Sequence, residues 1–315
     1  MNREKVIKIA MVVCVVVLLC AVIITSTGMF GEMGIGGYAN AEMYTAGPAE
    51  ITEAVKNLDI SWTAGKVTVV YHAGNTVTLE ESAKRELSQD EQLQWWMDGD
   101  TLRVQFTKPG LHLNMPSKEL TVTLPEGMEL AQAAIHTTSG DIETSALKAE
   151  LLVLDSTSGH IAVTAEAKNA EINATSGDQL VRLSGEAEIV RINSTSGDID
   201  AEVEKAVIFE SASTSGSVRM KAAECREAKA NSTSGKIDVS LGKLEKLNIG
   251  ATAGDVTARL PEDPGFTAKV STTAGKFTSD IALAKDGDKY VCGDGSAQVE
   301  IGTTAGDVRL EAAEK

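Results

Sequence analysis

Aromatic side chains and positive charge are both scarce in this chain of 315 residues. Phe, Trp and Tyr together make up 4% of the sequence, while small residues such as Ala, Thr, Ser and Gly are abundant. This composition suits thin, regular layers better than a bulky globular core. The formal net charge of −16 argues against nucleic-acid binding, because a protein that binds nucleic acid needs a basic surface.

Residues that hold metals or act as nucleophiles are also few. The four histidines show no metal-ligand spacing; they are His72, His112, His136 and His160. The sequence contains no phosphate-binding loop, nucleophile elbow or kinase motif. We therefore expect no enzyme, and no catalytic residue, cofactor or metal ion. The alternative is a glycan-active β-helix enzyme, which would need acidic or basic residues clustered across adjacent coils.

Charge is absent from one long N-terminal segment. Ile9 to Thr25 contains no charged residue, and the uncharged run continues to Gly31. A helix of this length can cross a hydrocarbon core of about 30 Å. The basic residues Arg3, Lys5 and Lys8 precede the segment. The positive-inside rule then places the N-terminus in the cytoplasm and everything after residue 31 outside.

These features predict a single-pass protein of the cell membrane in three parts. Residues 1–30 form the cytoplasmic N-terminus and the transmembrane anchor, residues 31–50 form a flexible linker, and residues 51–315 form an extracytoplasmic domain. A cleaved signal peptide is the alternative, because Ala-Asn-Ala at 39–41 resembles a cleavage site. That site lies far beyond the apolar run, which favours the uncleaved anchor.

Thr-Ser-Gly or Thr-Ala-Gly recurs along the rest of the chain. The closing glycines are Gly65, Gly140, Gly159, Gly177, Gly197, Gly216, Gly235, Gly254, Gly275 and Gly306. From Gly140 to Gly275 the steps are 19, 18, 20, 19, 19, 19 and 21 residues. Apolar residues dominate the positions seven and five before each glycine and two after it. Because a spacing of two places side chains on one face of a strand, we predict one strand before each glycine and another after it.

A period near 19 residues restricts the fold. It is too short for a βαβ unit, which needs about 30 residues, and the leucine-rich repeat pattern is missing. A meander of hairpins would not explain why every repeat keeps the same corner residues. We therefore predict an all-β protein, a parallel β-solenoid (β-helix) in which each column stacks on itself at about 4.8 Å. Right-handed winding is favoured.

Within the solenoid we predict irregular coils over 51–130 and regular coils over 131–315. Gln179 does not fit its apolar column, and Leu180 beside it predicts a one-residue bulge. Cys225 and Cys292 lie about three coils apart, which is farther than a disulfide permits. We therefore expect two free thiols.

Two polar columns accompany the corners. Aspartate often follows the glycine, and Asp178 and Asp198 occupy neighbouring coils. We interpret these acids as solvated turn residues, with calcium binding as the alternative. Threonine stands two positions before every corner glycine. We interpret this column as a structural ladder of hydroxyls; the alternative is an ice-binding face, which usually shows a Thr-x-Thr pattern.

The last strand, from Asp307 to about Glu311, has no following coil to pair with in the sequence. An uncovered edge would pair with further strands. We therefore expect residues 284–296 and 311–315 together to cover it.

The TSGDI-type corners, the phrases VTLPEG and ARLPEDPG before two corners, and the N-terminal apolar segment together resemble the putative bacterial adhesin family. This is a group of β-strand-repeat proteins of unknown function that includes LiaG-like membrane proteins of envelope-stress operons. The resemblance covers about residues 51–315. It implies a β-strand-repeat fold and a place in a Gram-positive-type cell envelope, and it transfers no catalytic residue.

The predicted function is that of a non-catalytic, membrane-anchored adhesin or scaffold at the cell envelope. The expected partners are the membrane itself and either an envelope glycan or another membrane protein. The alternatives are an envelope-stress accessory that contacts a membrane sensor and, with less support, the glycan-active enzyme.

Overall fold

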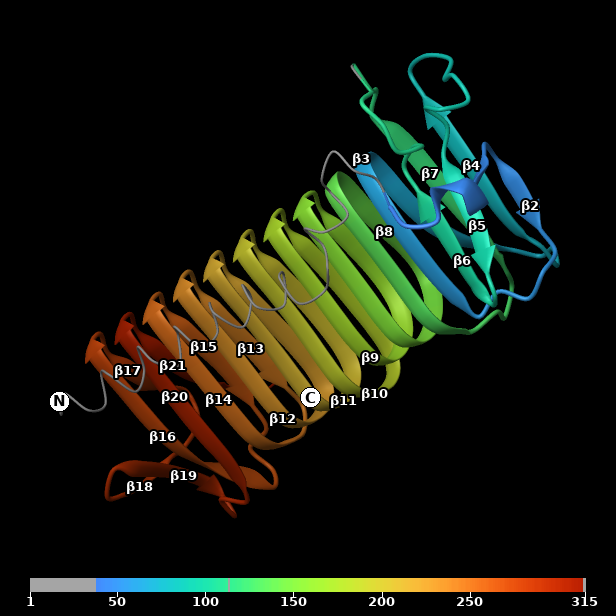
Figure 1. Cartoon of the computed structure of the whole chain (residues 1–315). Coiled ribbons are helices and arrows are strands. Elements are labelled where there is room, and N and C mark those ends of the chain that lie inside the picture. The colour runs from blue at the N-terminus through green and yellow to red at the C-terminus, as the bar shows by residue number, and fades with distance from the viewer. Residues whose placement is uncertain (1–37, 113, 314–315) are drawn as a thin grey trace.

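The computed structural model describes residues 38–112 and 114–313, which form one elongated stack of β-strands (Figure 1). The apolar segment predicted to span the membrane lies outside these residues. Within the described part of the chain, no helix is long and apolar enough to cross a membrane. A short 3-10 helix, η1, occupies Ala41–Met43.

The strands confirm the all-β prediction. They are β1 (Thr45–Ala46), β2 (Ala49–Ile51), β3 (Asn57–His72), β4 (Val77–Ala83), β5 (Gln94–Asp98), β6 (Thr101–Gln105), β7 (Lys118–Pro125), β8 (Leu130–Ser158), β9 (Ile161–Ser176), β10 (Gln179–Ser196), β11 (Ile199–Ser215), β12 (Val218–Ser234), β13 (Ile237–Leu241), β14 (Leu244–Ala253), β15 (Val256–Leu260), β16 (Gly265–Ala274), β17 (Phe277–Ser279), β18 (Ala284–Asp286), β19 (Lys289–Gly293), β20 (Ala297–Ala305) and β21 (Val308–Ala312).

Successive repeats pair in parallel, and equivalent residues lie side by side. Ile142 of β8 lies beside Ile161 of β9, which lies beside Gln179 of β10. The same column continues from β10 through β11 to β12. The predicted parallel solenoid is therefore confirmed, and its handedness stays a prediction.

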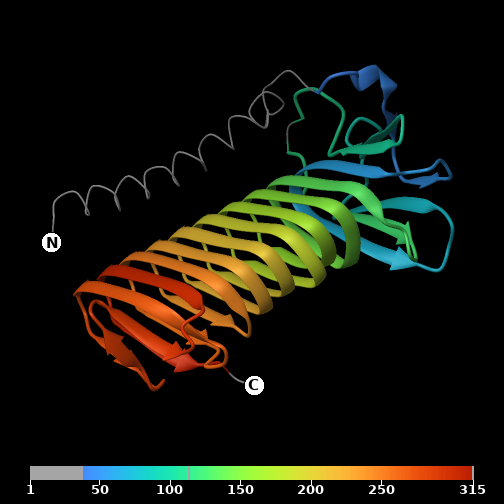
Figure 2. The same ribbon diagram turned by 90° about the horizontal axis from the view of Figure 1, so that it is seen from below.

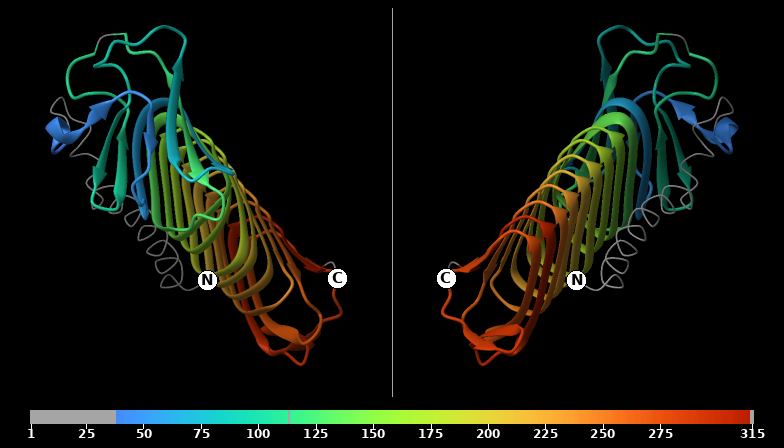
Figure 3. Two further views of the ribbon diagram at one scale, coloured as in Figure 1. Left: turned by 90° about the vertical axis from the view of Figure 1, so that its right-hand side faces the viewer. Right: turned by 90° about the vertical axis from the view of Figure 1, so that its left-hand side faces the viewer.

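Each turn of chain, called a rung here and named by its corner glycine, is a flattened loop with two long sides (Figure 3). The first side precedes the glycine and the second side follows it; a broad bend joins their far ends. In the Gly197 rung, Val190 and Ile192 of the first side are buried, and so is Ile199 of the second side. The core consists of such apolar side chains packed between the two sides.

Gln179 occupies its inward position without any shift in strand register, so the bulge predicted there is wrong. The ladder to the preceding rung is instead interrupted between Ser184 and Ile189. Gly185, with φ of +76°, lies in this interruption and takes up the extra residue. Gln179 is buried, and its Nε2 donates to the carbonyl of Asn193 at 2.7 Å. This hydrogen bond lets an amide stand in an apolar column.

The C-terminal end of the stack is threaded out of sequence order. Strand β20 lies between β14 and β16, and β21 lies between β15 and β17. Figure 1 shows the red β20 and β21 inside the orange β16 and β17. The expectation that residues 307–311 form an open terminal edge is therefore wrong. The re-entering strands gain a parallel partner on each side, which satisfies their backbone hydrogen bonds on both edges.

The terminal rung in space is formed by β16 and β17. Strand β19 pairs antiparallel with Gly265–Ala268 of β16, and β18 pairs with β19. Residues 284–293 thus cover part of the end of the stack, as expected. Ala313, which follows β21, does not, because its N–H donates to the carbonyl of Leu260, two rungs further in, at 2.9 Å. Lys269 and Lys276 stand on the terminal rung itself, and charged lysines on an edge oppose further strand pairing.

The N-terminal end is threaded in the same way. Strand β3 lies between β8 on one side and β6 with β7 on the other. The outer edges of β6 and β7 are covered by the antiparallel strands β5 and β4, which pair in turn with β1 and β2. Residues 38–56 and 73–129 are called the N-terminal cap here, and Figure 2 shows the cap at one end of the stack.

The cap begins earlier in the chain than the predicted linker allows. Strands β1 and β2 lie within residues 31–50 or overlap their end, and Ile51 is buried in the core. Residues 41–50 therefore belong to the folded domain, while residues 31–37 lie outside the described part.

Cys225 and Cys292 are both buried and free, which confirms the expectation of two unpaired thiols.

Candidate functional site

Glycine occupies the regular corners because successive corners stack so closely that a side chain would not fit between them. Gly197 has φ of +133°, where residues other than glycine are strained. A Cβ added to Gly197 would lie 2.2 Å from the carbonyl oxygen of Gly177. The recurring Thr-Ser-Gly is therefore a packing requirement of the solenoid and does not by itself indicate a ligand.

The corner aspartates connect neighbouring rungs. Oδ1 of Asp198 accepts the backbone N–H of Ser217 at 2.7 Å, and the N–H of Asp198 donates to Oδ1 of Asp178 at 2.9 Å. Asp141 accepts the N–H of His160 in the same way at 2.8 Å. These acids are exposed turn residues, as interpreted from the sequence, but each also binds the next rung. Among the described residues no group of three or more His, Cys, Asp and Glu could hold a metal ion.

The buried hydroxyl ladder stands three positions before the glycine and not two. Thr137 donates to the carbonyl of Gly140 at 2.8 Å, and Ser232 donates to that of Gly216 at 3.3 Å. The threonines two positions before the glycine, such as Thr195, point outward instead. The prediction misplaced the ladder by one residue, because strand alternation turns the third position toward the core and the second toward solvent.

A buried lysine replaces the corner glycine in the outermost rung of the N-terminal cap. Lys118 is fully buried, and its Nζ lies 2.9 Å from the carboxylate of Glu81. The same Nζ lies 5.0 Å from the ring of Trp62 and 4.4 Å from that of Phe106. Burial lowers the pKa of the Lys118 ammonium, and the carboxylate of Glu81 opposes that shift. This pair could not be recognised from the repeat, because the irregular coils do not align with it.

On the long sides and at the bends, outward charges of opposite sign pair between neighbouring rungs. On the second side, Arg182 pairs with Asp200 of the next rung at 3.0 Å, and Asp200 pairs with Arg219 of the rung after that at 3.2 Å. The bends follow the same rule, as in the pair of Lys148 and Glu166 at 3.0 Å. Stacking in register would bring like charges to about 4.8 Å if the sign did not alternate. Reading each outward column down the aligned repeats would have revealed this pattern.

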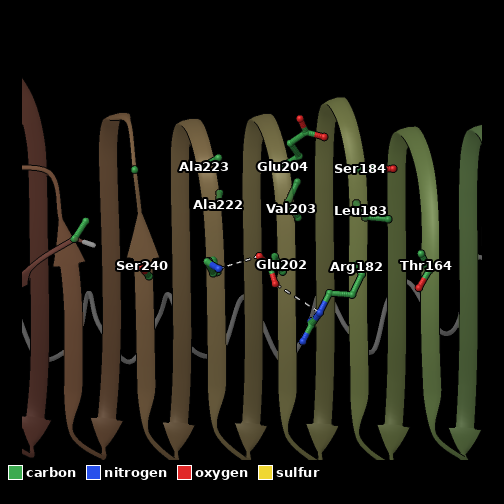
Figure 4. Close-up of a pocket in the computed structure, with 13 residues that line it drawn as sticks. Thr164, Arg182, Leu183, Ser184, Glu202, Val203, Glu204, Ala222, Ala223 and Ser240 are labelled. Carbon is green, nitrogen blue, oxygen red and sulfur yellow. Dashed lines mark ion pairs between the residues drawn. The ribbon is translucent and has the colours of Figure 1, made fainter. Parts of the chain in front are cut away.

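A groove of about 580 Å³ crosses the second side near the bend (Figure 4). It extends from the Gly159 rung to the Gly235 rung, across the Gly177, Gly197 and Gly216 rungs between them. Its outward lining includes Arg182, Ser184, Glu202, Glu204, Lys221 and Gly242. The groove exists because small residues stand at the bend, where Ser184, Ala223 and Gly242 leave space between longer side chains. None of these residues was singled out from the sequence, because the hollow forms only when the rungs stack.

The charged groups of the groove are joined to one another. Glu202 lies 3.0 Å from Lys221 and 3.7 Å from Arg182, as the dashed lines in Figure 4 mark. Glu204 accepts the backbone N–H of Gly185 at 2.8 Å. Both carboxylates thus already have a cationic or N–H partner. This arrangement can hold complementary charges, and it differs from the pair of unequal carboxyl groups that glycoside hydrolysis uses.

The comparisons with known proteins agree with this architecture. Residues 55–311 match the family model described as Toastrack DUF4097. The chain belongs to this family. The match confirms the predicted resemblance to a family of β-strand-repeat proteins of unknown function. No curated protein matches the chain.

Three solved structures resemble this Toastrack domain in outline. A "putative cell adhesion protein" from Clostridium sporogenes ATCC 15579 is 11% identical over 85% of this chain and 99% of that chain, with a TM-score of 0.24. A "putative adhesin" from Bacteroides fragilis NCTC 9343 is 13% identical over 84% and 95%, with a TM-score of 0.36. A "putative lipid binding protein" from Parabacteroides distasonis ATCC 8503 is 14% identical over 84% and 96%, with a TM-score of 0.46. At TM-scores below 0.5 these similarities carry no argument about function.

The histidines considered as metal ligands lie apart from the groove. Nδ1 of His136 lies 2.9 Å from the carboxylate of Asp155 on the first side, and His160 stands at a corner. His72 bonds to the carbonyl of Thr76 in the N-terminal cap at 2.8 Å. Each therefore has a local structural partner, and the Toastrack domain brings none of them to the groove.

Proposed function

We propose that this chain is a non-catalytic, membrane-anchored protein whose Toastrack domain presents a binding surface outside the cell membrane. The observation that carries the binding role is the open groove of the second side. Its carboxylates are held by Arg182, Lys221 and a backbone N–H. A rigid surface with paired charges favours recognition of a partner over acid–base chemistry.

The anchor is supported by the uncharged segment from Ile9 to Thr25 and the basic residues before it. Six residues, and thus seven Cα–Cα steps, separate Gly31 from Tyr38, the first described residue. Fully extended, they span at most about 25 Å. An anchor in the membrane would therefore hold the N-terminal cap close to the outer surface of the bilayer, while the stack extends over about 48 Å at roughly 4.8 Å per rung.

The location is tested by fractionating cells and adding protease to intact cells stripped of their wall. We expect the protein in the membrane fraction and its C-terminal domain cleaved by external protease. A protein that resists external protease, or that is released into the medium, would exclude the proposed anchor and topology.

The partner is sought by cross-linking the anchored protein in its own membranes before purification. An envelope glycan and another membrane protein are the two expected classes. The matched control is the same chain with Arg182 and Lys221 both replaced by Ala. Partners that depend on the groove should be lost from this control, whereas partners retained at full yield bind elsewhere on the protein.

A further inference from the structure

The groove carries charges of alternating sign along the axis of the stack. Arg182, Glu202 and Lys221 stand on three successive rungs, about 4.8 Å apart. Their side chains are 37%, 47% and 62% exposed. Ion pairs between exposed side chains contribute little to stability. These three side chains can therefore give up their ion pairs with one another and pair with charges on a ligand, with little loss of protein stability.

The dimensions of the groove match a short extended polypeptide. Its outward lining runs from Thr164 to Gly242, over four rung spacings, which is about 19 Å. An extended chain advances about 3.4 Å per residue, so about five residues fit along the axis. Ser184, Ala223 and Gly242 keep the floor of the groove free of long side chains.

One end of the groove is already formed by polypeptide from another part of the chain. Ala313 follows β21 of the Gly306 rung, yet it lines the groove together with Gly242 of the Gly235 rung. Its N–H donates to the carbonyl of Leu260 at 2.9 Å. This bend therefore accommodates a residue that comes from a different rung. The lining contains no aromatic ring against which the apolar face of a sugar could pack.

We propose that this groove binds an extended peptide segment that lies along the stack and presents acidic and basic side chains alternately on the face toward the groove, at every second residue. Arg182 and Lys221 bind the acidic side chains, and Glu202 and Glu204 bind the basic ones. This proposal rests on the binding role proposed above and names its ligand class. Side chains of a single sign along the ligand face would meet a like charge in the groove, so the groove selects by charge pattern.

The test uses the full chain in a neutral detergent and measures fluorescence anisotropy with two labelled tetrapeptides. One has the sequence Glu-Glu-Lys-Lys, which presents one acidic and one basic side chain on each face of an extended chain; the other is Glu-Lys-Glu-Lys, which presents like charges on each face, so that composition and net charge are equal. We expect Glu-Glu-Lys-Lys to bind more tightly, and its affinity to fall as salt is added. Lys221→Glu should weaken this binding by about tenfold or more, because it replaces an attractive charge with a repulsive one.

Blocking variants locate the binding. Ser184→Trp and Ala223→Trp fill the groove from two different rungs and should both abolish binding of Glu-Glu-Lys-Lys. Ser145→Trp is the matched control, because Ser145 is an exposed serine of an earlier rung and does not line the groove. Circular dichroism establishes that each variant keeps its strand content.

Three results would overturn the proposal. The first is equal binding of the two peptides, and the second is binding that survives both blocking variants. The third is that neither peptide binds at millimolar concentration, while a neutral oligosaccharide binds the unaltered protein and does not bind the Ser184→Trp variant. That result would make the groove a glycan site. Each of these results would leave the membrane anchor intact, since the fractionation experiment tests it separately.

Discussion

Replacing a corner glycine should damage the stack far more than its small size suggests. In Gly197→Ala the added Cβ would lie 2.2 Å from the carbonyl oxygen of Gly177, well inside van der Waals contact. The φ of +133° is also strained for alanine, which costs about 1–3 kcal/mol. The backbone must shift by more than 1 Å to relieve such a contact, since ordinary contacts begin near 3.5 Å.

That shift would disturb the hydrogen bonds that hold neighbouring corners together. The N–H of Gly197 donates to the carbonyl of Ser215, and the N–H of Gly177 donates to that of Ser196, both at 3.1 Å. Each such bond contributes about 1 kcal/mol. We therefore expect Gly197→Ala to lower the free energy of unfolding by about 3–5 kcal/mol, a large part of the total for a typical domain.

The same column offers a matched control. A Cβ on Gly140 would lie 3.2 Å from the carbonyl oxygen of Gly65, and Gly140 does not have a φ in the left-handed region. Gly140→Ala should therefore cost about 1 kcal/mol or less. Urea unfolding followed by far-ultraviolet circular dichroism compares the two variants, with the slopes checked because repeat proteins can unfold in parts. Equal midpoints for the two variants would refute close stacking as the reason for the glycine column.

Three other predictions follow from single contacts. Asp198→Ala should cost about 1 kcal/mol, because the N–H of Ser217 loses its acceptor, whereas Ile192→Asp should unfold the domain by burying a charge; unfolding curves that rank the two variants the other way would contradict the assignment of core and corner. Gln179→Ile should raise the free energy of unfolding by about 1 kcal/mol, because Oε1 of Gln179 is buried without a hydrogen-bond partner among the described residues; a lower midpoint in urea would mean that its Nε2 bond matters more. Burial raises the pKa of Cys225 to about 12, so little thiolate is present at pH 8 and iodoacetamide should label this thiol only after unfolding; rapid labelling of the native protein, mapped by mass spectrometry, would show that Cys225 is accessible.

Much of the rung could be predicted because its signals are local and repeated. The alternation around Ile192 and Ile199 identifies two strands that face one core, and the glycine between them identifies the corner. The errors arose where one residue departs from the pattern. Gln179 keeps its place through a hydrogen bond to Asn193, which a polar residue in an apolar column does not reveal by itself.

The groove could not be predicted, because its lining comes from five consecutive rungs that are each unremarkable in isolation. Ser184 and Gly242 are 58 positions apart in the numbering, yet they belong to one hollow, and Ala313 reaches it from a third part of the chain. The alternating charges of Arg182, Glu202 and Lys221 were visible in the sequence. Whether these three side chains are neighbours in space depends on which rungs lie side by side, and the parallel stacking had to be established first.

The sequence by itself determined the repeating unit: its length, its two strands, its corner and the parallel stacking of regular repeats. Only the tertiary structure decided the order of rungs at the two ends, where β3 and β20 each lie one rung further in than their place in the chain suggests. The physical reason is that the residues of a rung specify which of its side chains are buried, but they do not specify with which neighbouring strand edge the rung pairs. At each end a strand can pair with either of two similar edges, and the choice depends on loop length and on the antiparallel strands that cover the outermost rung.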